Sequence, residues 1–241
     1  MEEGPEEKTT EQHAWIIARP CFDPATEYSH VFCQELIDLM LKAGTNFFDF
    51  PGPEATRKAV TELLEAIPQA HFIFYDHGSE QGLVAQGGGD YIIDKSNSEL
   101  LIGRIVYTLA CLWGQDGGWQ AKREGARAVH CYVEVVGFMT SALEDFQESF
   151  NYGFKLLHER MQTDEPNFQG ILELEKKKMT ELSDKLMKQG NFMAASWMNR
   201  NRDSLRWYNG GSEPPESKCF LRRLAVKVFG KRGWNLLKPF F

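Results

Sequence analysis

Long apolar runs and closely spaced cysteine pairs are both missing from this sequence. Nothing approaches the roughly 18 consecutive apolar residues that a membrane-spanning helix requires. The opening residues, MEEGPEEKTTEQ, are acidic and polar and lack the basic start and apolar core of a secretory leader, so we expect a cytoplasmic protein. The five cysteines are scattered without a CxxC pair, which argues against a disulfide framework or a zinc site and predicts reduced thiols.

Sequence signals for a bound metal or nucleotide are also missing. Four of the six histidines, considered as ligands, do not follow metal-ligand spacing: His13, His71, His130 and His158. The three consecutive glycines at 87–89 lack the following Lys-Ser/Thr of a phosphate-binding loop, as well as its strand–glycine–helix context. We therefore expect a protein that works without a metal ion or an organic cofactor.

Charge is distributed unevenly along the chain. The net charge is −7, but from Arg200 onward ten Lys and Arg stand against three Asp and Glu, so residues 1–199 carry −14. The last stretch, 220–241, alternates basic side chains with Leu, Val, Phe and Trp. Two interpretations stay open: contact with nucleic acid or anionic lipid, or a terminal helix packed on the main domain with its basic side chains in water.

Apolar segments and amphipathic segments alternate along the first two thirds of the chain. Strands are predicted at 13–20, 45–50, 71–75, 105–112 and 128–138, with a hairpin at 82–94 around the three glycines. Helices are predicted at 29–42, 54–67, 99–103, 119–125 and 142–161, the first with Ser29 as N-cap and Gly44 as C-cap. This order predicts an α/β three-layer sandwich with a mostly parallel central sheet.

The pattern changes after Gln162. A charged helix is predicted at 170–189, then a polar loop at 199–217, then a basic amphipathic stretch at 220–229. We therefore expect an α/β domain over 1–161 and a helical, basic extension over 162–241 that packs on the same domain.

Two side chains with catalytic potential follow neighbouring candidate strands. His77 comes directly after the third strand, and Cys111 lies at the end of the fourth. Functional groups of open α/β sheets gather at the carboxyl ends of strands, so the pair is expected to face one cleft. An imidazole can take the proton of a thiol and later protonate a leaving amine, which is the chemistry of a cysteine peptidase. The plain alternative is a packing cysteine and a turn histidine.

Glycine follows the candidate histidine directly. Without a side chain, the Gly78 backbone can approach a substrate carbonyl closely, and its N–H, with that of Cys111, can donate to the oxyanion of a tetrahedral intermediate.

The segment Asp76-His77-Gly78, the Gly82-Leu83 hairpin start and the strand ending Leu109-Ala110-Cys111 together resemble the caspase-like cysteine peptidases of clan CD, in their CHAT and gingipain-like branch. The resemblance covers roughly residues 14–157. It implies that His77 is the general base and acid, Cys111 the nucleophile and Gly78 an oxyanion-hole donor. It also implies a protein or peptide substrate, including a dedicated or regulatory protein partner.

Four further residues are candidates for substrate binding. Asp76 either orients His77 or lies in the substrate pocket, and Trp113 either forms a substrate shelf or packs the loop down. Asp116 and Glu134 are acidic groups for a basic P1 side chain, or else solvated and paired surface acids. The unusual Leu-Trp after Cys111 and the uneven charge keep a second hypothesis open, a catalytically inactive interaction or scaffold protein that uses its basic C-terminal surface.

Overall fold

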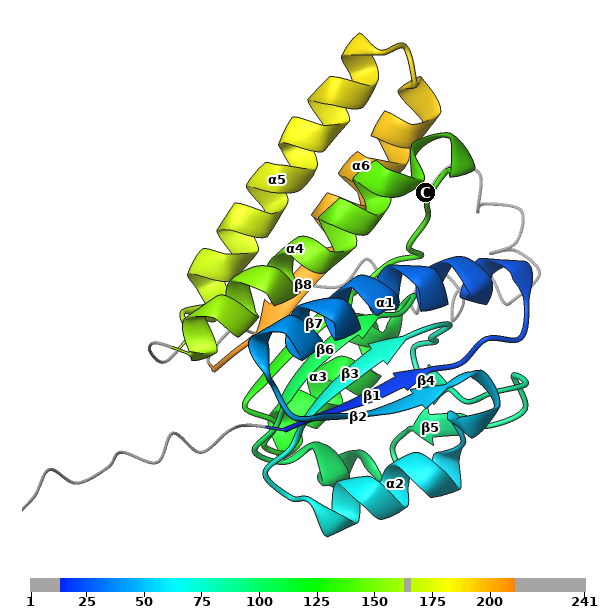
Figure 1. Cartoon of the computed structure of the whole chain (residues 1–241), viewed down its shortest axis with the longest axis vertical. Coiled ribbons are helices and arrows are strands. Elements are labelled where there is room, and N and C mark those ends of the chain that lie inside the picture. The colour runs from blue at the N-terminus through cyan, green and yellow to red at the C-terminus, as the bar shows by residue number, and fades with distance from the viewer. Residues whose placement is uncertain (1–13, 163–165, 211–241) are drawn as a thin grey trace, which may run out of the picture.

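A six-stranded sheet runs through the middle of the molecule in the order β2-β1-β3-β6-β7-β8 (Figure 1). The computed structural model describes residues 14–162 and 166–210. The strands are β1 (Trp15–Arg19), β2 (Phe47–Pro51), β3 (His71–Tyr75), β4 (Leu83–Val84), β5 (Tyr91–Ile93), β6 (Ile105–Leu109), β7 (Ala128–Tyr132) and β8 (Leu205–Tyr208). Neighbours in the large sheet are parallel except for β7 and β8, and β4 and β5 form a separate antiparallel hairpin.

The four central strands β1, β3, β6 and β7 are buried along their whole length. A strand covered on both faces has no water-facing side, which is why these segments read as continuous apolar runs rather than alternating ones. The predicted α/β class and mostly parallel sheet are confirmed.

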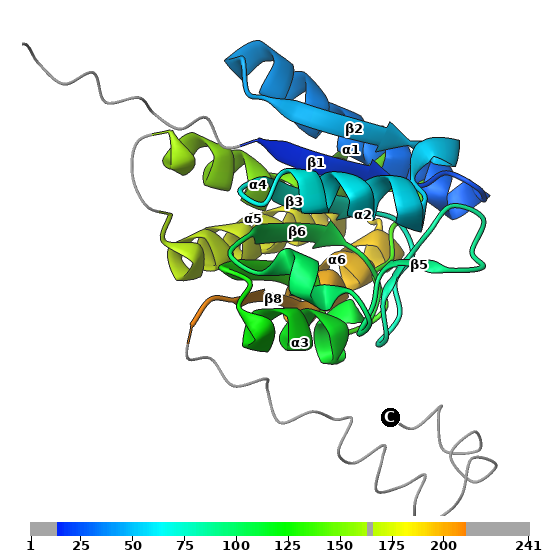
Figure 2. The ribbon, with the colours of Figure 1, turned by 90° about the horizontal axis from the view of Figure 1, so that it is seen from below.

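Helices cover both faces of the sheet, so the molecule has three layers. They are α1 (Pro24–Ala43), α2 (Arg57–Ala66), α3 (Gly117–Glu124), α4 (Leu143–Met161), α5 (Phe168–Lys188) and α6 (Phe192–Ser204). One core lies between the sheet and α1, α4, α5 and α6, and the second lies between the sheet and α2, α3 and the hairpin. Figure 1 shows α1 and α4 on the side of the sheet opposite α2, and Figure 2 shows α2 and α3 covering the near side.

Helix α1 begins five residues before the predicted N-cap, Ser29. Asp23 is the N-cap, with its carboxylate accepting hydrogen bonds from the Ala25 and Thr26 N–H groups, and Pro24 occupies the first helical turn. These are strong helix-start residues, and they override the weaker signal of a serine inside the apolar pattern. The predicted C-cap Gly44 is correct, because it adopts the left-handed conformation at φ 68°.

Two strands are shorter than predicted, and both shortenings shape the site. The strand predicted at 105–112 ends at Leu109, and Leu112 turns the chain with a φ of 63°. The strand predicted at 128–138 ends at Tyr132, because the chain then leaves the sheet to pack beside the segment after β6. Apolar residues continue past both ends, but they do not belong to the strands.

The predicted loop at 199–217 is wrong over its first part. Helix α6 continues to Ser204, and β8 then joins the large sheet as an antiparallel edge strand beside β7. Asn199 and Asn201 read as loop residues, but Asn201 is fully buried and bonded to another segment, so tertiary contacts override its weak helix propensity. The predicted basic stretch at 220–241 lies outside the described residues. None of the described helices is long and apolar enough to cross a membrane.

Candidate active site

The imidazole of His77 lies just beyond the carboxyl end of β3 and meets the start of α1. Its Nε2 is 2.7 Å from Oδ2 of Asp23, and the ring of Phe22 packs edge-on against it with centroids 5.8 Å apart. Both contacts come from the segment between β1 and α1, which is more than 50 residues away in the chain. The histidine is therefore held in one orientation by a carboxylate and an aromatic ring.

Asp23 stays ionised in this position. Burial acts to raise its pKa, but the hydrogen bonds from the Thr26 N–H and from His77 outweigh burial and lower the pKa below its ordinary value. A carboxylate accepts hydrogen bonds only, so the histidine donates from Nε2, and in the neutral imidazole Nδ1 is then the nitrogen that can accept a proton. The sequence reasoning missed Asp23: the Asp-Pro pair marks a helix start, but nothing local links it to His77.

Cys111 lies two residues beyond β6, and its thiol packs against the chain that follows β7. The Val136 N–H donates to Sγ at 3.3 Å, and the Val136 carbonyl oxygen is 3.8 Å from the same sulfur. Burial raises the pKa of the thiol, and the hydrogen bond from the Val136 N–H opposes that rise without cancelling it. The thiol is therefore protonated at neutral pH and needs a base before it can act as a nucleophile. Val136 is a second residue that the sequence reasoning did not single out.

Strands β3 and β6 are direct parallel neighbours, with Tyr75 opposite Leu109, so the segments that follow them start side by side. Gly78 packs against the segment of Cys111: a Cβ placed on Gly78 would lie 2.8 Å from the Cβ of Ala110 and 2.8 Å from the Cys111 oxygen. Any larger residue at 78 would push the two segments apart. The close approach thus depends on the glycine that the sequence singled out.

Both members of the pair line one open pocket between α1, the strand ends and the chain after β7. Its lining residues are Ala25, Thr26, Ser29, Asp76, His77, Leu109, Ala110, Cys111, Val136, Phe138 and Phe150. Most of these side chains are apolar, with the imidazole, the thiol and one carboxyl group among them. A pocket of this composition suits an apolar group of a ligand beside a few polar groups.

Asp76 also lines this pocket, and it is the most perturbed titratable group there. It is only 5% exposed. One of its carboxylate oxygens accepts a short hydrogen bond from the His77 backbone N–H, and the other is buried with no hydrogen-bond partner among the described residues. Burial raises its pKa to about 7. The carboxyl does not hydrogen-bond the His77 ring, whose Nε2 is bonded to Asp23 instead.

The other three candidate substrate-binding residues lie outside the pocket. Trp113 is 1% exposed and belongs to the core on the α2 and α3 side, packed against Gly117 and Gly118. Asp116 pairs with Lys95 at 3.0 Å, and Glu134 pairs with Arg200 at 3.3 Å. Trp113 and Glu134 thus have the packed and paired arrangements that were their plain alternatives, whereas Asp116, whose plain alternative was a solvated loop acid, is paired.

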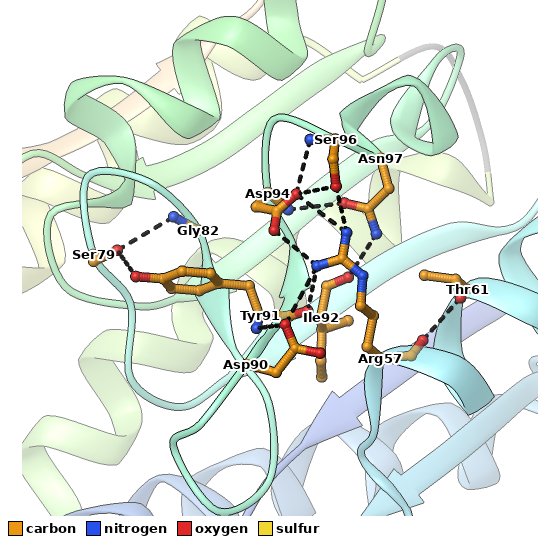
Figure 3. Close-up of polar contacts among 10 residues, drawn as sticks. All are labelled: Arg57, Thr61, Ser79, Gly82, Asp90, Tyr91, Ile92, Asp94, Ser96 and Asn97. Carbon is orange, nitrogen blue, oxygen red and sulfur yellow. Dashed lines mark hydrogen bonds and ion pairs between the residues drawn. The ribbon is translucent and has the colours of Figure 1, made fainter.

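A polar network fastens the β4–β5 hairpin, which begins just after Gly78. The Arg57 guanidinium from α2 donates to both oxygens of Asp94, at 2.7 and 3.2 Å, and to the Ser96 hydroxyl at 2.6 Å (Figure 3). At the other end of the hairpin, the Ser79 hydroxyl donates to the Tyr91 hydroxyl at 3.1 Å. The loop that carries His77 and Gly78 is thus tied to α2 through its hairpin.

Within residues 14–162 and 166–210, no group of three or more His, Cys, Asp and Glu side chains is placed to hold a metal ion. The arrangement supplies instead an imidazole, a thiol and an orienting carboxylate, which are the parts of acyl-transfer chemistry.

Comparison with known proteins adds a likeness of fold. No protein-family model matches the chain, and no curated protein matches it. A solved structure, the complex of Porphyromonas gingivalis RgpB pro- and mature domains, is similar with a TM-score of 0.53 and 15% sequence identity. The match covers 86% of this chain and 49% of that chain, so the protein spans about half the length of the chain it resembles. The α/β sandwich is therefore consistent with the caspase-like fold.

Proposed function

We propose that this protein is a caspase-like cysteine peptidase in which His77 and Cys111 form the catalytic pair. The observation that carries the proposal is their placement after two adjacent parallel strands, where both line one pocket and Gly78 packs against the Cys111 segment. The fold that the chain shares with the gingipain RgpB supports a peptidase of this general kind. The expected partner is a protein or peptide substrate, and a regulatory protein is a further expectation.

The proposed chemistry uses the two ring nitrogens of His77 differently. Asp23 accepts the Nε2–H bond, which leaves Nδ1 to take the proton from the Cys111 thiol. The thiolate attacks the peptide carbonyl carbon, the C–N bond breaks, and the imidazolium gives its proton to the leaving amine. Water then hydrolyses the thioester with His77 as base, which returns the free thiol. Asp23 stabilises the imidazolium formed between these steps.

Backbone N–H groups of Gly78 and Cys111 are the proposed donors to the oxyanion. Charge develops on the carbonyl oxygen as the thiolate attacks, and fixed donors at that position contribute more than mobile water does. The ideal Cβ position of Gly78 lies 3.4 Å from the Cys111 nitrogen, so the two residues lie side by side.

A peptidyl acyloxymethyl ketone tests the pair directly, because it alkylates an activated thiol at a peptide-binding site. We expect one adduct, on Cys111, whose rate of formation falls about a hundredfold in His77→Ala. Cys21→Ala is the matched control, since Cys21 is the other cysteine of intermediate exposure in the described chain. Adducts that form at the same rate without His77, or that form equally on Cys21, would sink the assignment.

One observation favours the second hypothesis, the inactive scaffold. Burial raises the pKa of Cys111, whereas reactive cysteines usually sit where their pKa is lowered. The same labelling experiment separates the two functions: a scaffold leaves Cys111 unmodified by the peptidyl ketone while the folded protein still binds its partner.

A further inference from the structure

The loop from Val133 to Met139 lies between the Cys111 segment and helix α6. The backbone of this loop makes two hydrogen bonds to the Cys111 segment. The Glu134 carbonyl accepts from the Leu112 N–H at 3.1 Å, and the Val136 N–H donates to the Cys111 side chain, at Sγ, at 3.3 Å. The position of the thiol therefore depends on where this loop is held.

Helix α6 holds the loop through the side-chain amide of Asn201. The Asn201 Nδ2 donates to the Gly137 carbonyl at 2.7 Å, and its Oδ1 accepts from the Gly137 N–H at 3.1 Å. One amide thus satisfies both polar groups of one peptide residue, as a neighbouring strand would. Asn201 is fully buried, so losing this pair leaves unsatisfied polar groups in the interior.

Gly137 is also held sterically. A Cβ placed there would lie 2.3 Å from the indole ring of Trp197, which also belongs to α6. Only glycine fits between the loop and this ring without one of them moving.

The loop has two further attachments to α6, near its start. The Val133 N–H donates to the Ser204 carbonyl at 2.9 Å, and Arg200 pairs with Glu134 at 3.3 Å. The ion pair is half exposed, so it adds little, and Arg200 offers a control whose removal leaves the hydrogen bonds of Asn201 intact.

We propose that Asn201 is a positioning residue for Cys111: its amide holds Gly137, and so sets the neighbouring Val136 N–H where it donates to the cysteine sulfur. Asn201 does not touch the reacting atoms and acts only through the loop. The inference rests on the proposed function of Cys111 as the nucleophile. A hydrogen bond to an ionised acceptor is stronger than one to a neutral acceptor, so the Val136 N–H stabilises the thiolate more than the thiol.

The test is the pH dependence of Cys111 alkylation by iodoacetamide in the full-length chain, which needs no peptidase activity. In Asn201→Ala we expect the apparent pKa of the thiol to rise by about one unit and the rate at neutral pH to fall about tenfold. Arg200→Ala, one residue away on the same helix, should keep the wild-type profile. A wild-type profile in folded Asn201→Ala would overturn the proposal.

A second pair of variants covers the case in which Asn201→Ala does not fold. Gly137→Ala pushes the loop from α6 and should shift the profile in the same direction, and adding Trp197→Ala should restore it, because the smaller residue makes room for the new methyl group. A folded Gly137→Ala with unchanged alkylation, or no recovery in the double variant, would contradict the positioning role. If the wild-type protein lacks peptidase activity while these shifts occur, only the proposed function fails.

Discussion

Asp23 has two roles at the start of α1, and they are separable. Its Oδ1 caps the helix through the Ala25 and Thr26 N–H groups, while its Oδ2 accepts from His77. A serine at this position keeps a capping oxygen but is too short to reach the imidazole. Substitutions that remove one role or both roles should therefore have different effects.

In Asp23→Ser we expect near wild-type stability but a loss of His77-dependent labelling on the order of tenfold or more, because the ring loses the partner that fixes its tautomer. Asp23→Ala should show the same loss and also cost about 1 kcal/mol of stability, the usual effect of removing a cap. Urea unfolding and peptidyl-ketone labelling, measured side by side, check both expectations. Equal labelling in wild type and Asp23→Ser would show that the carboxylate does not orient the histidine.

Asp76 predicts a pH-dependent stability. Its folded-state pKa is raised by burial to about 7, from 3.8 for the free group. Because the folded state binds the proton more tightly, the stabilisation from protonated Asp76 is fully present below about pH 4 and is lost as pH rises through about 7. Asp76→Asn removes this cost, so its stability advantage over wild type should grow by up to ~4 kcal/mol between pH 4 and pH 8.

Urea unfolding of wild type and Asp76→Asn at pH 4, 6 and 8 measures that difference. Asp184→Asn, an exposed acid on α5, is the matched control for removing one negative charge. A constant difference between wild type and Asp76→Asn across this range would mean that the carboxyl is not desolvated.

At the scale of elements, the hairpin between His77 and Cys111 is held by Arg57. Its hydrogen bonds lower the pKa of Asp94 well below the ordinary range, so the pair contributes stability above about pH 4 that is lost as Asp94 is protonated at lower pH. Arg57→Lys loses the forked geometry and should cost ~1–2 kcal/mol at pH 7, with a smaller difference near pH 3.

Denaturant unfolding at both pH values checks the Arg57 prediction. Lys58→Ala is the control on the same turn of α2. The Lys58 ammonium makes an exposed pair with Glu62, 3.8 Å long, so its loss should change stability by less than ~0.5 kcal/mol. A cost for Arg57→Lys that does not vary with pH would show that the pairing with Asp94 contributes nothing.

At the scale of the whole molecule, residues 166–210 pack into the main core. Strand β8 pairs with β7, and the fully buried Glu175 of α5 lies 3.0 Å from Nε2 of His130 in β7. Apolar side chains of α5, α6 and β8 also belong to the core that contains α1 and α4. Residues 166–210 are therefore a structural part of the α/β domain.

A chain cut to residues 1–162 should consequently fail to unfold cooperatively and should aggregate. It leaves the β7 edge unpaired and one face of the sheet without α5 and α6. A chain of residues 1–210, which keeps every contact described above, is the matched control and should behave as the full chain does in circular dichroism and gel filtration. A monomeric, cooperatively unfolding 1–162 protein would contradict this account.

Several features followed from the sequence alone. The buried runs of β1, β3 and β6 predicted the parallel sheet, and the positions of His77 and Cys111 after consecutive strands predicted that they line one pocket. These are local signals, because short segments of the sequence determine both the burial pattern and the order of the strands. Their catalytic roles remain a prediction that the labelling experiment decides.

Only the tertiary structure decided which groups surround the pair. Asp23 reaches His77 across 54 residues, Val136 reaches Cys111 across 25, and Asn201 reaches Gly137 across 64. Each of these residues has an ordinary local identity, as a helix cap, a loop valine or a polar residue near a helix end. A hydrogen bond requires its two atoms to lie about 3 Å apart in space. Local sequence patterns do not specify which distant segments come that close, because this depends on how the layers pack.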